Sequence, residues 1–207
     1  MATVTRRTWL LTLGVAPMAG GLAAWAQGPR PVHTGHALSA RERIQQQHLP
    51  NVEVITHEGR RVRFYDDLVR DKKVIINFMY AKCDGICVPT TMNLASVQKR
   101  LGDRVGRDIF MYSITLNPVE DSPAALREYR VLHGVHGSWL FLTGAPDDIE
   151  HLRRGLGFAF TDPVEDADKT NHIGNVRYGV EPLMRWAACP GMANPEHIAR
   201  SIMWDLA

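Results

Sequence analysis

An almost unbroken apolar stretch, residues 74–79, leads directly to two cysteines, Cys83 and Cys87. Such a stretch is typical of a central parallel strand that is covered on both faces, because a half-exposed strand alternates apolar and polar residues. In sheets of this kind, functional groups gather beyond the carboxyl ends of the strands. The two thiols follow such an end, so the sequence predicts a functional site there.

A helix is predicted to start just after the second cysteine, where Pro89 is typical of a first helical turn. The N-terminus of a helix favours negative charge. We therefore expect the helix to stabilise a thiolate at Cys87, and Lys82 to add a positive charge beside Cys83. The carboxylate of Asp84 opposes that positive charge.

Residues 1–26 have the pattern of an export signal. The pair Arg6 and Arg7 resembles a twin-arginine motif, the stretch 10–24 is built of apolar and small residues, and Ala26 ends a small-x-small cleavage site. The alternative is an uncleaved N-terminal membrane anchor. In either case the rest of the chain is expected outside the cytoplasm, in the periplasm.

Residues 27–50 carry Pro29 and Pro31 among polar residues and show no sustained apolar period. This composition predicts a flexible arm between the signal and the folded domain. His33 and His36 fall in this arm, where solvated polar side chains are expected rather than a metal site.

Charge excludes one class of function. Removing residues 1–26 takes away two of the 24 Lys and Arg side chains and none of the 22 Asp and Glu side chains, so the exported part is formally neutral with His uncharged. A neutral domain without a basic stripe lacks the electrostatic footprint of a nucleic-acid-binding protein. No nucleic-acid partner is therefore expected.

Beyond the arm, strand and helix patterns alternate over residues 51–207, which predicts one α/β domain. A hairpin is expected first, and an antiparallel hairpin is expected at the far edge of the sheet. The strands are expected at residues 52–56, 61–64, 74–79, 109–115, 139–143, 174–178 and 183–187, with helices after Cys87, after Ser122, over 146–154 and after Asn194. An acidic loop at residues 162–168 is interpreted as solvated.

The spacing of the two cysteines leaves two kinds of site open. Four residues apart on a helix, their Cα atoms would be about 6 Å apart, near the upper part of the range that a disulfide accepts. Two thiolates on one metal ion leave their sulfurs roughly 4 Å apart, so the spacing suits a metal at least as well. In an oxidising compartment, either a disulfide or a metal site is expected.

A third ligand is sought among the histidines. Two thiolates and one imidazole would make a soft three-coordinate site that suits Cu(I) and holds Cu(II) with a further ligand. His172, at a predicted strand entrance, is the candidate imidazole. Cys189 has no partner at a useful spacing and is interpreted as a spare thiol, and His133 and His136 are interpreted as structural residues at a helix end.

Three motifs in order make residues 50–207 resemble the SCO/SenC family, whose members are exported thioredoxin-like proteins that assist assembly of copper centres. The motifs are 77–80 leading to Cys83 and Cys87, 115–118 followed by 121–123, and His172. The resemblance implies a thioredoxin-like sandwich with a central mixed sheet flanked by helices and an added N-terminal β-hairpin. It also implies that Cys83, Cys87 and His172 hold the copper-ligand positions.

The chain departs from the family pattern at three motif positions, and its tail at residues 185–190 also differs from the family form. Asp84 stands where many members have Pro, Val88 separates Cys87 from Pro89 where Pro commonly follows the cysteine directly, and Asn117 stands where Asp is usual. These departures bear on metal preference and on the client protein.

The resemblance implies a copper metallochaperone that assists assembly of a copper centre in a respiratory enzyme, cytochrome c oxidase or a similar protein. Its partner would be an apo copper enzyme, such as an oxidase subunit. The alternative is a thiol-disulfide oxidoreductase, in which Cys83 attacks a disulfide of the client and Cys87 resolves it, so that the copper-site cysteines of the client stay reduced. Dependence on His172 separates the two, because dithiol exchange needs no imidazole ligand.

Overall fold

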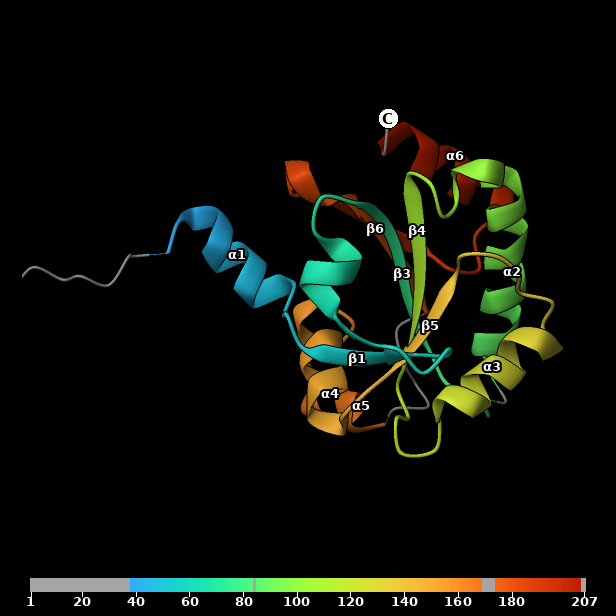
Figure 1. The fold of residues 1–207 in the computed structure, drawn as a ribbon, viewed down its shortest axis with the longest axis horizontal. Helices are drawn as coiled ribbons and strands as arrows, with labels where there is room; N and C mark the ends of the chain where they lie inside the picture. Colours follow the sequence, from blue (N-terminus) through green and yellow to red (C-terminus); the bar gives the residue numbers. More distant parts are fainter. Residues whose placement is uncertain (1–37, 84, 169–173, 206–207) are drawn as a thin grey trace, which may run out of the picture. The chain divides into compact units, whose positions relative to one another are not determined.

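The computed structural model describes residues 38–83, 85–168 and 174–205, which belong to one compact unit that begins at Leu38 (Figure 1). Helices and strands alternate along it. In chain order they are α1 (Ala40–His48), β1 (Glu53–Thr56), β2 (Arg61–Arg63), η1 (Phe64–Val69), β3 (Lys73–Met79), α2 (Cys87–Leu101), η2 (Gly102–Arg104), β4 (Ile109–Thr115), α3 (Pro123–Leu132), β5 (Leu140–Thr143), α4 (Pro146–Gly155), α5 (Pro163–Ala167), β6 (Asn175–Val180), η3 (Glu181–Leu183), β7 (Arg185–Pro190) and α6 (Pro195–Asp205).

The strands form one mixed seven-stranded sheet in the order β2-β1-β5-β4-β3-β6-β7. β3, β4 and β5 run parallel, whereas the hairpins β1–β2 and β6–β7 join the sheet antiparallel. The predicted mixed α/β sheet is therefore confirmed, and so are the hairpin ahead of it and the hairpin at its far edge.

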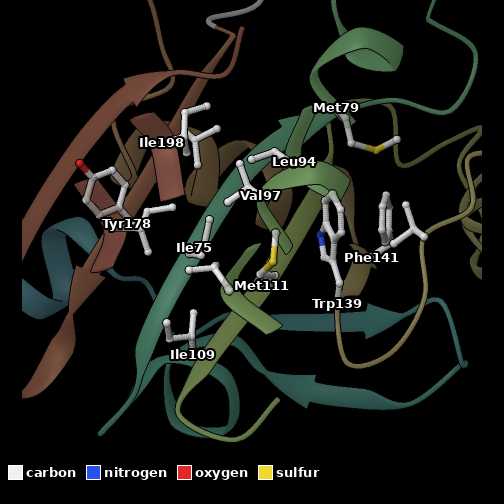
Figure 2. Close-up of a cluster of buried hydrophobic side chains, with 14 of the residues drawn as sticks. Ile75, Met79, Leu94, Val97, Ile109, Met111, Trp139, Phe141, Tyr178 and Ile198 are labelled. Carbon is white, nitrogen blue, oxygen red and sulfur yellow. The ribbon is translucent and has the colours of Figure 1, made fainter. Parts of the chain in front are cut away.

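β3 occupies the centre of the sheet, as its apolar run predicts. Six of its seven residues are buried, and alternate side chains enter two different cores. Ile75 and Met79 point into one core with Trp139 and Phe141, as Figure 2 shows. Val74 and Ile76 join the other. The strand is covered on both faces, so its carboxyl end is held rigidly from both sides.

Different helices cover the two faces. On one face, α2, α3 and α6 contribute buried side chains that include Leu94, Leu126 and Ile198. On the other face, η1 and α4 contribute Phe64 and Leu152. Figure 1 shows α2 and α3 on one side of the strands and α4 on the other. Among the described residues, no helix has both the length and the apolar composition needed to cross a membrane.

The prediction of a flexible arm over residues 27–50 was wrong for its second half. Helix α1 lies there and begins with a capping box, in which the Ser39 side chain accepts a hydrogen bond from the Glu42 N–H (3.2 Å) and the Glu42 carboxylate accepts one from the Ser39 N–H (2.7 Å). No residue of the helix is buried, so no apolar period marks it in the sequence. Residues 27–37 lie outside the described residues.

Polar contacts attach α1 to the domain. The Arg41 guanidinium donates a hydrogen bond of 2.6 Å to Glu181, whose side chain is fully buried. Glu181 also accepts hydrogen bonds from the Tyr65 hydroxyl (2.8 Å) and the Asp71 N–H (2.9 Å). The arrangement satisfies a buried carboxylate with three donors and holds the start of the described chain.

The interpretation of the acidic segment 162–168 as a solvated loop was also wrong. It contains helix α5, and Asp166 on that helix is buried. Both of its carboxylate oxygens accept hydrogen bonds of 2.6 Å from the buried Arg153. Sequence reading missed this pair because the arginine is supplied by another helix, 13 positions earlier in the chain.

Helix α6 buries Ile198 and Ile202 as predicted, but Met203 is 39% exposed rather than in the core. Leu206, also expected in the core, lies outside the described residues.

A buried histidine makes stability depend on pH. The His57 side chain is buried, its Nε2 lies 2.6 Å from an Arg130 nitrogen, and its Nδ1 lies 3.3 Å from the Phe141 N–H. Burial, and then the positive charge of Arg130, lower the pKa of His57. The folded protein therefore keeps this ring neutral, whereas the unfolded chain takes up a proton below about pH 6.5.

We expect the contribution of His57 to the free energy of unfolding to be complete above that pH. It should be lost progressively as the pH drops toward the lowered pKa of His57. His57→Gln should flatten this dependence between pH 7 and pH 5 in urea denaturation. His151→Gln, at an exposed histidine, is the control and should leave it unchanged. An identical slope in wild-type protein and His57→Gln would contradict the assignment.

Candidate metal centre

The two cysteines lie beyond the carboxyl end of β3, at the place that the sequence predicts. β3 ends at Met79, a turn at Ala81 and Lys82 follows, and α2 begins at Cys87 itself. The helix thus starts two residues before the expected Pro89. Proline is tolerated there because the first-turn N–H groups have no partner within the helix.

Both thiols are enclosed in the protein. Cys83 is 8% exposed and Cys87 is 1% exposed, and both pack in the core shared with α2 and α3. The two side chains are hydrogen-bonded to each other, and Cys83 Sγ also accepts from the Gly85 N–H at 3.4 Å. The structure therefore brings the two sulfurs together as one dithiol site, with Cys83 at its more open side.

The surroundings push the pKa values of the two thiols apart. Burial alone would raise the pKa of Cys83, but hydrogen bonds from the Cys87 side chain and N–H, the Gly85 N–H and the Tyr80 side chain lower it overall. Burial, followed by the hydrogen bond with Cys83, raises the pKa of Cys87 strongly. The lowered pKa favours Cys83 as the more reactive thiol, and the raised pKa favours the protonated form of Cys87.

This result corrects the expected source of thiolate stability. The sequence predicts the thiolate at Cys87 and a contribution from Lys82. Lys82 is instead 84% exposed, and its ammonium lies 3.8 Å from the Glu120 carboxylate. Hydrogen bonds at Cys83, one of them from the first N–H of α2 at Cys87, lower the pKa of Cys83 without the lysine. Asp84 lies outside the described residues.

His172 also lies outside the described residues, so its role as a ligand stays a prediction. The chain resumes two residues later at Gly174, whose N-terminal neighbours the structure does not describe. A Cβ atom at Gly174 would lie 2.6 Å from Ile86 Cδ1. Gly174 therefore lies beside Ile86, the residue that directly precedes Cys87.

The other candidate residues do not join the dithiol. Cys189 lies on the edge strand β7 opposite Val176, and burial raises the pKa of its thiol. The His133 ring packs on Tyr129 with centroids 4.3 Å apart, which supports a structural role. Within the ranges that the structure describes, no group of three or more His, Cys, Asp and Glu side chains is arranged to hold a metal ion.

Sequence reasoning missed a carboxylate behind the cysteine loop. Asp121 is buried and accepts a hydrogen bond of 2.9 Å from the Ala81 N–H. It shares the wall of a cleft of about 640 Å³ with Ala81, Lys82 and Tyr129. The only signal in the sequence was its place in a motif, just ahead of the helix that Ser122 caps.

Alkylation should distinguish the two thiols. At pH 7.5, in reduced protein carrying Cys189→Ser, we expect iodoacetamide to modify Cys83 before Cys87, because Cys83 is more exposed and has the lower pKa. Tandem mass spectrometry of the peptide that carries both residues measures the order. Equal or faster labelling of Cys87 would show that the assignment is reversed.

Comparisons with known proteins agree with this geometry. The SCO1/SenC family model matches residues 41–202. Protein SCO1, mitochondrial, of Saccharomyces cerevisiae is 33% identical over 89 residues, a match that covers 43% of this chain and 30% of the yeast protein. The match thus spans less than a third of the length of that relative.

Solved structures share the fold. Bradyrhizobium japonicum ScoI with copper bound superposes with a TM-score of 0.60 at 20% identity, over 74% of this chain and 96% of that one. BsSco superposes with a TM-score of 0.60 at 19% identity, over 75% of this chain and 91% of that one. Its structure is described as identifying a disulfide switch in a member of the Sco family of cytochrome c oxidase assembly proteins. The structure has the thioredoxin-like fold of the Sco proteins, and the chain belongs to the SCO1/SenC family.

Proposed function

We propose that this protein is a copper-binding assembly factor, which takes up copper through Cys83, Cys87 and His172 and passes it to an apo copper enzyme such as an oxidase subunit. The observation that carries the proposal is the pair of adjacent thiols beyond the carboxyl end of β3 in a member of the SCO1/SenC family. The copper bound to B. japonicum ScoI and the oxidase-assembly description of BsSco support it.

The described donors suit copper as cargo. Thiolates are soft ligands that select Cu(I), and an imidazole completes a three-coordinate site. Both thiols must lose their protons when the ion binds. Transfer proceeds by ligand exchange, in which a donor atom of the client binds the ion as one thiolate leaves and takes up a proton. The copper keeps its oxidation state, so no electron acceptor is required.

One observation favours a second function, thiol-disulfide exchange. The lowered pKa of Cys83 and the raised pKa of Cys87 are the properties of an attacking thiol and a resolving thiol. The Cys83 thiolate would attack a client disulfide and release one client thiolate. Cys87 would then lose its proton and attack Cys83 Sγ, which releases the second client thiolate. The client gains two electrons, and an external dithiol must reduce the Cys83–Cys87 disulfide again.

His172→Ala separates the two functions. It removes an imidazole ligand but leaves the hydrogen bonds that set the reactivity of the described thiols. In cells with scarce copper we expect this variant to fail in maturing the copper enzyme, although its purified form still forms and reduces the Cys83–Cys87 disulfide. Full maturation by His172→Ala, together with none by Cys83→Ser, would overturn the copper proposal and favour the oxidoreductase.

The periplasm is the proposed location, on the strength of Arg6 and Arg7 ahead of the apolar stretch 10–24. Replacing both arginines with lysine should leave the protein in the cytoplasm, because the twin-arginine pathway reads the guanidinium pair. Immunoblots of periplasmic and cytoplasmic fractions measure the distribution. Normal periplasmic accumulation of the variant would refute export by this pathway.

A further inference from the structure

A buried carboxylate, that of Asp121, lies behind the cysteine loop. The Asp121 side chain is 2% exposed, and no ion pair to it occurs among the described residues. Its Oδ2 accepts two hydrogen bonds, one from the Ala81 N–H (2.9 Å) and one from the Thr115 hydroxyl (2.5 Å). Burying a carboxylate carries a desolvation cost. The hydrogen bond that Asp121 makes to the cysteine loop is therefore expected to serve the structure of that loop.

The bond to Ala81 is made where the sheet can no longer hold the chain. β3 pairs with β4 as far as Met79. One further backbone hydrogen bond joins the two chain segments past the paired residues, from the Leu116 N–H to the Met79 carbonyl (2.7 Å). Ala81 has passed that point, so its N–H must find an acceptor elsewhere. Asp121 provides this acceptor. The backbone is thus held at Ala81, two residues before Cys83.

Asp121 is itself fixed to the end of β4. Its N–H donates to the Asn117 carbonyl (2.9 Å), and the Asn117 N–H donates to the Thr115 hydroxyl oxygen (2.9 Å). Ser122, the next residue, caps α3 by accepting from the Ala125 N–H (3.2 Å). A rigid turn therefore presents the carboxylate to the loop.

From this geometry we infer that Asp121 is a positioning residue for the dithiol: its carboxylate holds the backbone at Ala81, and thereby places Cys83 against Cys87. The inference deepens the proposed function, on which it rests for the role of the two thiols. Its test uses the copper-free protein, so that it succeeds or fails independently of copper binding.

Effective concentration is the quantity that positioning controls. Two thiols held in the right geometry form a disulfide more readily than two mobile thiols, because less chain motion must be frozen when the bond forms. The equilibrium of the full chain with reduced and oxidised glutathione, well below the unfolding temperature and in a Cys189→Ser background, gives this effective concentration. Global stability alone does not change it.

Three substitutions separate positioning from packing. Asp121→Ala removes the acceptor and should lower the effective concentration about tenfold. Asp121→Asn keeps an oxygen that accepts from Ala81 and should stay within about threefold of the wild type. Thr115→Val removes the other donor but keeps the bond to Ala81, so it should also stay within about threefold. An Asp121→Ala value within that range, or an equal loss in Thr115→Val, would overturn the inference.

A measurement on the unaltered protein covers the case in which Asp121→Ala does not fold. The Ala81 amide should exchange its hydrogen at least about 100-fold more slowly than an unprotected amide, because a buried acceptor holds it. Exchange at the rate of a free loop amide would show that the carboxylate does not hold this backbone, and would overturn the inference.

Discussion

Asp166→Ala should lower the free energy of unfolding by about 3 to 5 kcal/mol, the loss typical of removing one partner from a buried ion pair. In a domain of this size, the expected fall in melting temperature is roughly 6 to 20 °C. The loss is large because Arg153, itself 3% exposed, remains buried when its partner is removed.

Several contacts depend on this one carboxylate. Besides both bonds from Arg153, it accepts from the Arg154 guanidinium (2.8 Å) and from the Phe160 N–H (2.8 Å). The network fixes α5 and the turn ahead of it onto α4. The substitution does not remove Glu150, whose carboxylate lies 2.8 Å from the Arg153 guanidinium, so the arginine keeps one partner and the protein should still fold.

Glu165→Ala is the matched control. It removes an exposed carboxylate from the same short helix, where a change within about 0.5 kcal/mol is expected. Urea denaturation of both variants tests the prediction. If the two substitutions cost the same, the buried network does not stabilise the fold as described.

The sheet could be predicted from the sequence because apolar patterning decides it locally. The run that becomes β3 and the run that becomes β4 (Ile109–Thr115) are continuous enough to identify strands buried on both faces. The hairpin β6–β7 was likewise found, because Pro182 marks the connection between its two strands; Gly179, also expected in the turn, lies within β6.

The elements that sequence reading missed depend on partners brought together by the fold. α1 has no buried face and is attached by Arg41 to Glu181, 140 positions away. From the sequence alone, the Asp166 carboxylate is expected to be solvated, because its partner Arg153 is brought beside it only by the fold. Local pattern contains neither partner, so an arm and a loop were the natural expectations.

At the site, the sequence predicts the two thiols but not their difference. Their spacing and their place after β3 are local properties. The pKa asymmetry instead depends on burial and on the hydrogen bond between the two cysteines, with smaller contributions from Gly85 and Tyr80. The anchoring of the loop by Asp121 requires β4 to lie beside β3, and that is a tertiary fact.

Cys83→Ser should weaken Cu(I) binding by more than about 100-fold, because a neutral hydroxyl replaces one of the soft thiolate ligands that the ion prefers. Cys189→Ser should leave the affinity unchanged, since that thiol lies on β7 rather than in the dithiol. Competition with a chromophoric Cu(I) chelator measures both. Loss of copper by Cys189→Ser with retention by Cys83→Ser would mean that the site has been assigned to the wrong thiols.

We propose that Cys83, Cys87 and His172 together hold one copper ion. Anaerobic titration of the reduced, tag-free protein with Cu(I), in the presence of a competing chelator, tests it most directly. We predict one tightly bound ion per monomer, which the Cys83→Ser, Cys87→Ser and His172→Ala variants each fail to retain. A wild-type protein that binds no copper under these conditions, or a Cys83→Ser/Cys87→Ser double variant that binds it as tightly as the wild type, would contradict the claim.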